Sequence, residues 1–238
     1  MTRDAAENAA ATLLRRLQQL ERRDAERAQR PELARASAFL AQWQMRRLRY
    51  TYADFERSPR YAPAIRFFET DLYGGSTLDD RDGDIARVVP SMKRLLPTSV
   101  FETVADAIEL RAIAQQLDRV MVERLMPLGE HLGVCDYCNA YRAAGEYPSR
   151  QRQIALVAGV GRALDRYVQQ PLIRGALRMM RRPARVAGLS GLQDFLERGF
   201  AAFARMRGAD EFIATIDARE TALHEAIAGG ACDPFPDP

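Results

Sequence analysis

Carboxylates, a tyrosine and an arginine gather around one short stretch, RFFETDLYGG (Arg66–Gly75), and the acidic turn that follows it. A carboxylate can act as a general base, and an arginine can hold an anionic group. A pocket there would suit an enzyme or a small-ligand-binding protein, and its lining would be Glu69, Asp71, Tyr73, Asp82 and Arg87. The simpler interpretation is a core helix that buries its phenylalanines and turns its acids to solvent.

The acidic turn DDRDGD (Asp79–Asp84) only partly matches a calcium-binding loop. If Asp80 takes the first position, the sixth should be glycine but is Ile85, and the twelfth should be glutamate but is Ser91. Aspartates before a helix also have a simpler role, because they accept hydrogen bonds from its free N–H groups. We therefore expect helix capping in this turn.

Histidine and cysteine form one further candidate site. His131, Cys135 and Cys138 give the pattern H-x3-C-x2-C, to which Cys232 or His224 could add a fourth zinc ligand. A single CxxC is a weak signal, an odd cysteine count argues against a disulfide framework, and no βαβ pattern supports a redox dithiol. We expect packed thiols, no metal and no cofactor, although metal binding by His131, Cys135 and Cys138 stays open.

The stretch Phe67–Tyr73 reads FFETDLY and resembles the signature of a bacterial family, the FFLEELY-motif proteins. It has the two phenylalanines, the Leu-Tyr pair and an acid in fifth place, and departs in the middle positions. Thr51–Phe68, Arg87–Pro97 and Leu192–Phe203 are also similar to that family, so the resemblance runs from about Gln42 to the C-terminus. It implies a helical bacterial protein of unassigned activity and carries over no catalytic residues. Nucleophile, phosphate-loop and dinucleotide motifs are missing from the sequence as well.

Positive charge is concentrated in one part of the chain. Tyr147–Gln193 contains nine arginines and one acid, which gives this segment a charge of +8 in a chain of net charge +3. Within it, Leu172–Arg185 is both basic and amphipathic. Such a helix can dock on an acidic partner, lie on an anionic membrane or follow a nucleic-acid backbone. The candidate partner-binding residues are Arg174, Arg178, Arg181, Arg182 and Arg185.

The leading hypothesis is a non-catalytic interaction or regulatory protein that binds an unknown acidic protein partner through this surface. Peripheral association with an anionic membrane is the next choice, and self-association stays open. Nucleic acid is less favoured because no aromatic residues interleave with the arginines. Alternatively, the basic segment folds back on the chain's own acids, which include Asp79–Asp84, Glu102, Asp106 and Glu109.

Length and composition are those of a soluble globular protein. The 238 residues are 47% hydrophobic and 28% charged, which is ample material for a buried core. No run reaches the roughly 20 apolar residues of a membrane span. The N-terminus lacks the basic start and apolar block of a secretory signal, so we expect a cytoplasmic protein.

Helical periodicity dominates the chain, and strand-like alternation is nearly absent. We predict an all-α fold, a multi-helix bundle of about eight or nine helices, several of them long and some kinked by proline. Residues 1–30 are expected to form an N-terminal amphipathic appendage, and residues 31–230 a single α-helical domain. Residues 231–238 should be an exposed tail, because DPFPDP cannot be helical.

Overall fold

The computed structural model describes residues 15, 17–20, 22–23, 25–26, 29–72, 98–126, 132–186, 188 and 190–238. Within these ranges every regular element is helical and no strand is present, which confirms the all-α prediction. The elements are α2 (Pro31–Thr51), α3 (Ala53–Arg57), α4 (Ala62–Phe67), the π-helical turn η1 (Phe68–Leu72), α6 (Thr98–Leu125), α7 (Val134–Ala144), α8 (Tyr147–Val168), α9 (Pro171–Met179), α10 (Arg181–Val186), α11 (Ser190–Met206) and α12 (Asp210–Ala228).

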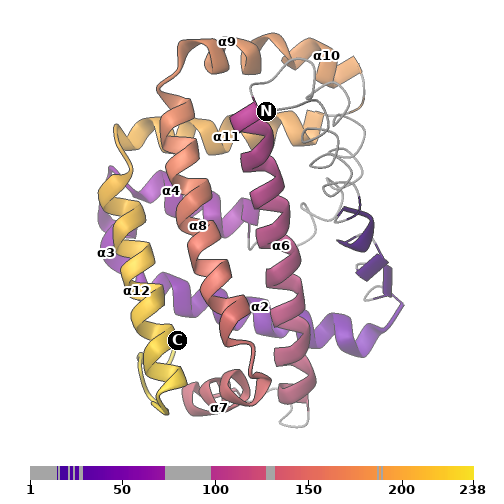
Figure 1. The fold of residues 1–238 in the computed structure, drawn as a ribbon, viewed down its shortest axis with the longest axis vertical. Helices are drawn as coiled ribbons and strands as arrows, with labels where there is room; N and C mark the ends of the chain where they lie inside the picture. Colours follow the sequence, from indigo (N-terminus) through magenta and orange to yellow (C-terminus); the bar gives the residue numbers. More distant parts are fainter. Residues whose placement is uncertain are drawn as a thin grey trace.

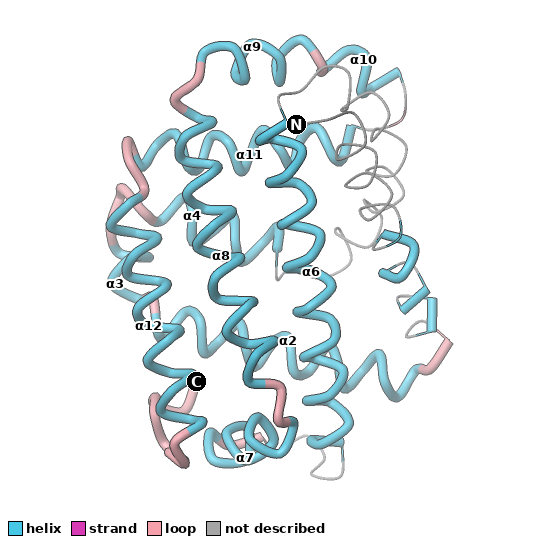
Figure 2. Tube along the Cα trace, viewed as in Figure 1, coloured by secondary structure: helices cyan, strands magenta, loops and turns pink. Residues whose placement is uncertain are grey.

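The long helices α6, α8 and α12 run along the long axis of the molecule, with α8 in the middle and packed against both neighbours (Figure 1). Behind them α2 crosses the lower half and α11 the upper half. Helix α7 lies across the lower end, while α9 and α10 lie across the upper end. Figure 2 shows that the described helices are joined by short loops. The prediction of a bundle with several long helices is therefore correct.

The buried side chains form two hydrophobic clusters. The first is rich in aromatic rings from α3, α4, α11 and α12, and its members include Phe55, Phe203 and Phe212. The second joins α2, α6 and α7 around Trp43 and Tyr137, whose rings stack with their centroids 4.4 Å apart. The indole Nε1 of Trp43 donates a hydrogen bond of 2.9 Å to the Leu132 carbonyl, so this buried ring keeps its polar partner.

The C-terminal tail is not fully exposed, and the expectation for residues 231–238 is wrong at Phe235. This ring is buried in the second cluster, where it packs edge-on against Trp43 at 6.0 Å and Tyr137 at 6.3 Å between centroids. The tail is not helical, as expected from its prolines. A non-helical segment can still bury an aromatic ring, because apolar burial does not depend on regular backbone structure.

Prolines and one tyrosine interrupt helices that the sequence pattern would continue. The helical stretch from Pro31 to Arg57 is divided at Tyr52, which separates α2 from α3. The basic amphipathic stretch Leu172–Arg185 is likewise divided between two helices, α9 and α10. Pro171 begins the first of them, and Pro183 lies in the first turn of the second, where its missing N–H costs no helical hydrogen bond. The helix that the acidic turn Asp79–Asp84 is expected to cap lies outside the described residues.

The described part of the N-terminal segment contacts the bundle. Leu17 and Leu20 are buried, and Arg23 Nη1 donates to the Ala112 carbonyl at 3.3 Å. An ion pair of 3.7 Å joins Glu26 to Arg119. The division of the chain into an appendage and a main domain at residue 30 stays a prediction.

The FFETDLY stretch starts within α4 and continues into η1, so its described part is helical as expected. Phe67 is buried, and its ring packs against Phe195 with the centroids 5.3 Å apart. A glycine makes this contact possible: a Cβ added to Gly199 of α11 would stand only 2.8 Å from Cζ of Phe67. Helix α11 can therefore approach α4 closely only while position 199 has no side chain.

We predict that Gly199→Ala lowers the free energy of unfolding by roughly 1–2 kcal/mol, because overpacking against Phe67 outweighs the gain in helix propensity. Gly159→Ala in α8 is the matched control. An added Cβ there meets nothing within 4 Å, so this variant should gain up to about 1 kcal/mol. Urea unfolding of both variants measures the difference. Equal stabilisation by the two substitutions would contradict the close contact with Phe67.

Candidate functional site

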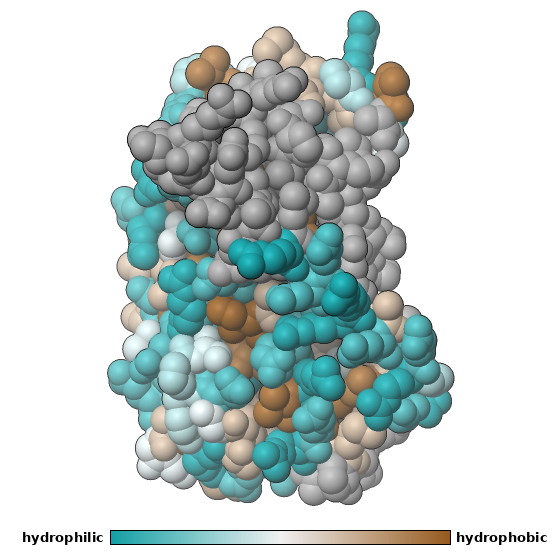
Figure 3. Space-filling view, turned by 45° about the vertical axis from the view of Figure 1, so that its right-hand side comes forward, coloured by the Kyte–Doolittle hydropathy of each residue, from teal (hydrophilic) through white to brown (hydrophobic). Residues whose placement is uncertain are grey.

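The outer side of α9 and α10 exposes apolar side chains among arginines. Leu172, Met179 and Val186 are 77%, 74% and 91% exposed, and they follow one another at intervals of seven residues. Exposed arginines accompany them at 174, 178, 182 and 185. We call these seven residues the basic ridge. Figure 3 shows hydrophobic and hydrophilic residues projecting together at the upper end of the molecule, where α9 and α10 lie.

The opposite side of these two helices faces the body of the protein. Ile173 and Leu177 are half-buried, and Ala184 is buried. The side chain of Gln193 in α11 donates a 2.8 Å hydrogen bond to the carbonyl of Leu177. The amphipathic pattern thus serves two purposes: one apolar face packs on the bundle, and a second, narrower apolar line is left at the surface.

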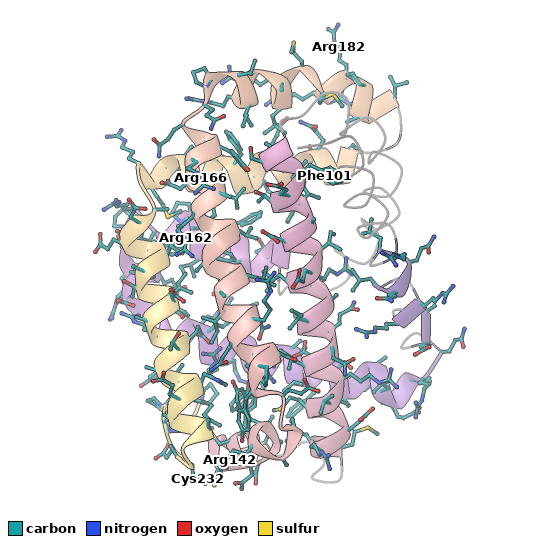
Figure 4. The ribbon with its side chains drawn as sticks, viewed as in Figure 1. Phe101, Arg142, Arg162, Arg166, Arg182 and Cys232 are labelled. Carbon is teal, nitrogen blue, oxygen red and sulfur yellow. The ribbon has the colours of Figure 1, made fainter. Side chains whose placement is uncertain are left out.

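The five predicted partner-binding arginines are not equivalent. Arg181 is committed to the protein itself, because its Nε and Nη2 each donate a 2.6 Å hydrogen bond to the carboxylate of Glu197. This guanidinium holds the pKa of Glu197 below its usual range. No ion pair among the described residues engages the other four, and Arg182 points away from the body at the upper end (Figure 4). Binding of a partner by all five residues stays a prediction.

The alternative that basic residues pair with the chain's own acids is correct for part of the segment. Arg152 of α8 donates to Glu109 of α6 with an Nε–Oε1 distance of 2.8 Å. The ion pairs of Arg152 and Arg181 show that carboxylates of the same chain neutralise part of the positive charge of the basic segment. The acidic turn Asp79–Asp84 lies outside the described residues.

Of the five side chains in the proposed pocket around FFETDLY, the structure describes one, Glu69. Glu69 receives two hydrogen bonds from Arg49, with distances of 2.7 Å to Nε and 3.3 Å to Nη2. This carboxylate therefore ties η1 to α2. The side chain of Asp71 and all of Tyr73, Asp82 and Arg87 lie outside the described residues, so the pocket stays a prediction.

The cysteines meet at the lower end of the molecule. Cys135 is exposed and Cys138 is buried in α7, and burial raises the pKa of the Cys138 thiol to about 11. Hydrogen bonds from Cys135 and Arg142 lower the pKa of Cys232, and Figure 4 shows Arg142 and Cys232 together. His131 lies outside the described residues, and the described ones contain no group of three or more potential metal ligands.

Sequence reasoning considered His224 as a possible zinc ligand, but it missed the set of polar side chains to which this residue belongs, between the two hydrophobic clusters. We call it the central polar cluster, and its members are Arg47, Tyr52, Tyr141, Arg150, Glu220 and His224. Glu220 of α12 accepts hydrogen bonds from Arg47 of α2 at 2.9 and 3.2 Å and from the Tyr52 hydroxyl at 2.8 Å. Burial by itself would raise the pKa of Glu220, but the charge and hydrogen bonds of Arg47 hold it below its usual range.

The other half of this cluster contains a surplus positive charge. Arg150, only 8% exposed, lies 4.5 Å above the Tyr141 ring, and its buried Nη2 has no hydrogen-bond partner within the described part of the chain. The Tyr141 hydroxyl and His224 Nδ1 are 2.8 Å apart. Burial and the nearby charge of Arg150 lower the pKa of His224, so its imidazole is neutral in the folded protein near neutral pH.

Comparison with known proteins adds a family to these observations. A family model described as a domain of unknown function (DUF8198) matches residues 13–234. No curated protein and no solved structure gives a significant match to the chain. Separately, none of the described helices combines the length and apolar character needed to cross a membrane.

We predict that Glu220→Gln lowers the free energy of unfolding by about 3 kcal/mol, because it leaves buried guanidinium groups without a counter-charge. Glu211→Gln on the same helix is the control. Glu211 is exposed and pairs with Arg60 at 3.3 Å, and it accepts a 2.5 Å hydrogen bond from the Tyr61 hydroxyl. Since the glutamine oxygen can still accept that hydrogen bond, loss of the charge should cost less than about 1 kcal/mol. Chemical denaturation distinguishes the two, and similar losses would show that Glu220 contributes no more than a surface pair.

His224 should make stability pH-dependent. Its pKa is lower in the folded protein than the usual 6.5, so below pH 6.5 the unfolded chain binds the extra proton first. The stabilising effect is complete above 6.5 and is lost as the pH falls, by at most about 1.4 kcal/mol per pH unit. In His224→Gln this contribution should vanish. Unfolding free energies of both proteins from pH 8 to 5 provide the measurement, and parallel curves would contradict the assignment.

Proposed function

We propose that this chain, which belongs to the family described as a domain of unknown function (DUF8198), is a non-catalytic interaction or regulatory protein that binds an acidic protein partner through the basic ridge. The observation that carries the proposal is the exposure of Leu172, Met179 and Val186 on helices whose charged residues are all arginine. A line of large apolar side chains at a protein surface is a common mark of an interaction site.

The chemistry of the ridge matches a partner with carboxylates and an apolar line. Burying a large apolar side chain yields about 1.5–3 kcal/mol, so three such residues can drive association. Arginine binds carboxylates through two parallel hydrogen bonds and therefore orients the partner as well as attracting it. Since Arg181 is already paired with Glu197, the contribution of charge falls to Arg174, Arg178, Arg182 and Arg185.

The spacing of the apolar residues favours a protein helix over a membrane surface. Leu172 and Met179 lie seven apart on α9 and form a narrow line, as in the contact between two helices, and Val186 adds an exposed apolar side chain on α10. A helix that lies in a membrane interface buries a broad apolar face, and the broader face here, with Ile173 and Leu177, is turned toward the bundle. Association with an anionic membrane is thus the second function, supported by the same exposed residues. The enzyme or ligand-binding alternative at the FFETDLY stretch is supported less, because Glu69 is occupied by Arg49.

A bacterial and cytoplasmic setting forms part of the proposal. The resemblance of FFETDLY and its flanking segments to the FFLEELY-motif proteins supports a bacterial origin. Cys135, Cys138 and Cys232 are all free thiols, which is usual in a reducing compartment.

We predict that the triple variant Arg174→Glu, Arg178→Glu and Arg185→Glu binds an acidic amphipathic peptide at least tenfold more weakly than the wild type. The probe is a fluorescent helical peptide with leucine and glutamate at heptad spacing, and the readout is anisotropy at two salt concentrations, because screening should weaken the interaction.

The matched control reverses the same number of charges at exposed arginines outside the ridge, Arg57, Arg124 and Arg205. It should bind the peptide like the wild type. Equal binding by the ridge and control variants would refute the ridge as a protein-binding surface. If wild type ignores the peptide but floats with phosphatidylglycerol vesicles, the membrane alternative takes its place.

A further inference from the structure

A groove of about 520 Å³ follows the outer side of α12 next to α8. Small side chains keep its floor low: Ala214, Ala218 and Ala222 succeed one another every four residues along α12. Acidic side chains accompany them, namely Asp210, Asp217 and Glu225. These three carboxylates form no ion pair within the described part of the structure. The groove thus offers an open, negatively charged track along one helix.

The neighbouring helix α8 contributes one residue to the groove lining. Arg162 is the basic residue of the groove lining, and Figure 4 shows it beside α12. Three acids and one base leave the lining with two net negative charges. Because small residues let helices approach closely, a partner helix with basic side chains fits this track better than a compact small molecule does.

The basic ridge of the same chain has the complementary properties. The ridge lies on two consecutive helices, α9 and α10, while the acidic track from Asp210 to Glu225 lies on the single helix α12 and spans about 22 Å at 1.5 Å per helical residue. The ridge presents large apolar side chains and arginines, whereas the groove presents alanines and carboxylates. Large side chains against small ones, and positive charges against negative ones, give a match in shape and in charge.

We propose that the acidic partner of the basic ridge is a second copy of this chain, whose α8–α12 groove receives the ridge. This inference rests on the proposed function, since it uses the same surface. In one copy, α9 and α10 lie across the upper end while α12, which supplies most of the groove lining, runs along the side (Figure 1), so the two surfaces face different directions. The contact is therefore head-to-tail, and repeated contacts build an open chain or a closed ring.

Sedimentation of the full chain across concentrations from about 1 µM to about 1 mM provides the test. The wild type should shift from its monomer mass of 26.8 kDa to larger species as concentration rises. The ridge variant (Arg174→Glu, Arg178→Glu, Arg185→Glu) and a groove variant (Asp217→Arg, Glu225→Arg) should each stay monomeric, because both contacts then join like charges. Asp210 is left unchanged because an acid at the start of α12 favours the helix.

Mixing the two variants supplies the decisive measurement. The reversed ridge then meets a reversed groove, and the native ridge meets a native groove, so larger species should reappear. Variants that had merely lost their fold could not regain association in this way. The control Arg57→Glu, Arg124→Glu and Arg205→Glu should assemble like the wild type, since these residues lie outside both surfaces.

Three results would overturn the inference: a wild type that stays monomeric at every concentration, a groove variant that still assembles, or a mixture that remains monomeric. Its failure can be distinguished from failure of the proposed function. A monomeric wild type that still binds the acidic peptide through the ridge would leave the proposed function intact and exclude the second copy as partner. A monomer that binds neither peptide nor groove would remove both.

Discussion

The arrangement of this bundle depends on one ion pair whose charged groups are largely removed from water. Arg47 and Glu220 are 173 positions apart in the chain, and together they join α2 at the back of the molecule to α12 at its edge. Desolvating two charges costs several kcal/mol, and only good geometry with further hydrogen bonds offsets that cost. The two guanidinium contacts and the Tyr52 hydroxyl supply those bonds. If either helix shifted along the other, the two charges would separate and each would lose its partner in a poorly hydrated site. The ion pair therefore determines how α2 and α12 align.

The same constraint connects the two hydrophobic clusters. Tyr52 belongs to the first cluster and Tyr141 to the second, yet each directs its hydroxyl toward the central polar cluster. Apolar packing by itself is non-directional and tolerates several alignments of similar helices. Polar groups that must be paired tolerate few. The paired polar groups thus give the interior one defined arrangement. The arginines at the upper end, where most of the surplus positive charge lies, stay available to a partner.

The contrast between inside and outside explains what the arginines do. Arg150 is buried and the Arg47 side chain is 12% exposed, and both organise the interior. Arg152 and Arg181 join neighbouring helices, whereas the ridge arginines form no such ion pair in the described structure. All are the same residue type in a chain that has 35 basic residues in total. Their roles differ because the side to which each helix position turns decides whether a carboxylate, a ring or solvent is within reach. The ridge and the groove are two surfaces where, among the described residues, several charged side chains have no ion-pair partner within the chain.

Features that depend on residues close together in the sequence were predictable, whereas features that depend on contacts between distant residues were not. Helix type, the long central helices and the burial of residues such as Trp43 and Phe212 follow from local periodicity, because every third or fourth residue returns to the same face. The exposure of Leu172, Met179 and Val186 does not, since a hydrophobic residue in an amphipathic helix is normally expected to be buried. Nor does the burial of Phe235, which depends on a contact between the tail and a ring at position 43.

By itself, then, the sequence determined the all-α class, the main helices and the concentration of arginine in one segment, because these are properties of neighbouring residues. Tertiary structure alone decided that Arg47 meets Glu220 and that carboxylates on α12 border an open groove. It also decided that Arg181 pairs with Glu197 whereas Arg182 points into solvent. Each of these outcomes depends on which distant helix lies beside a given face. Pairing across such distances is selected by the packing of the whole chain, which no local pattern encodes.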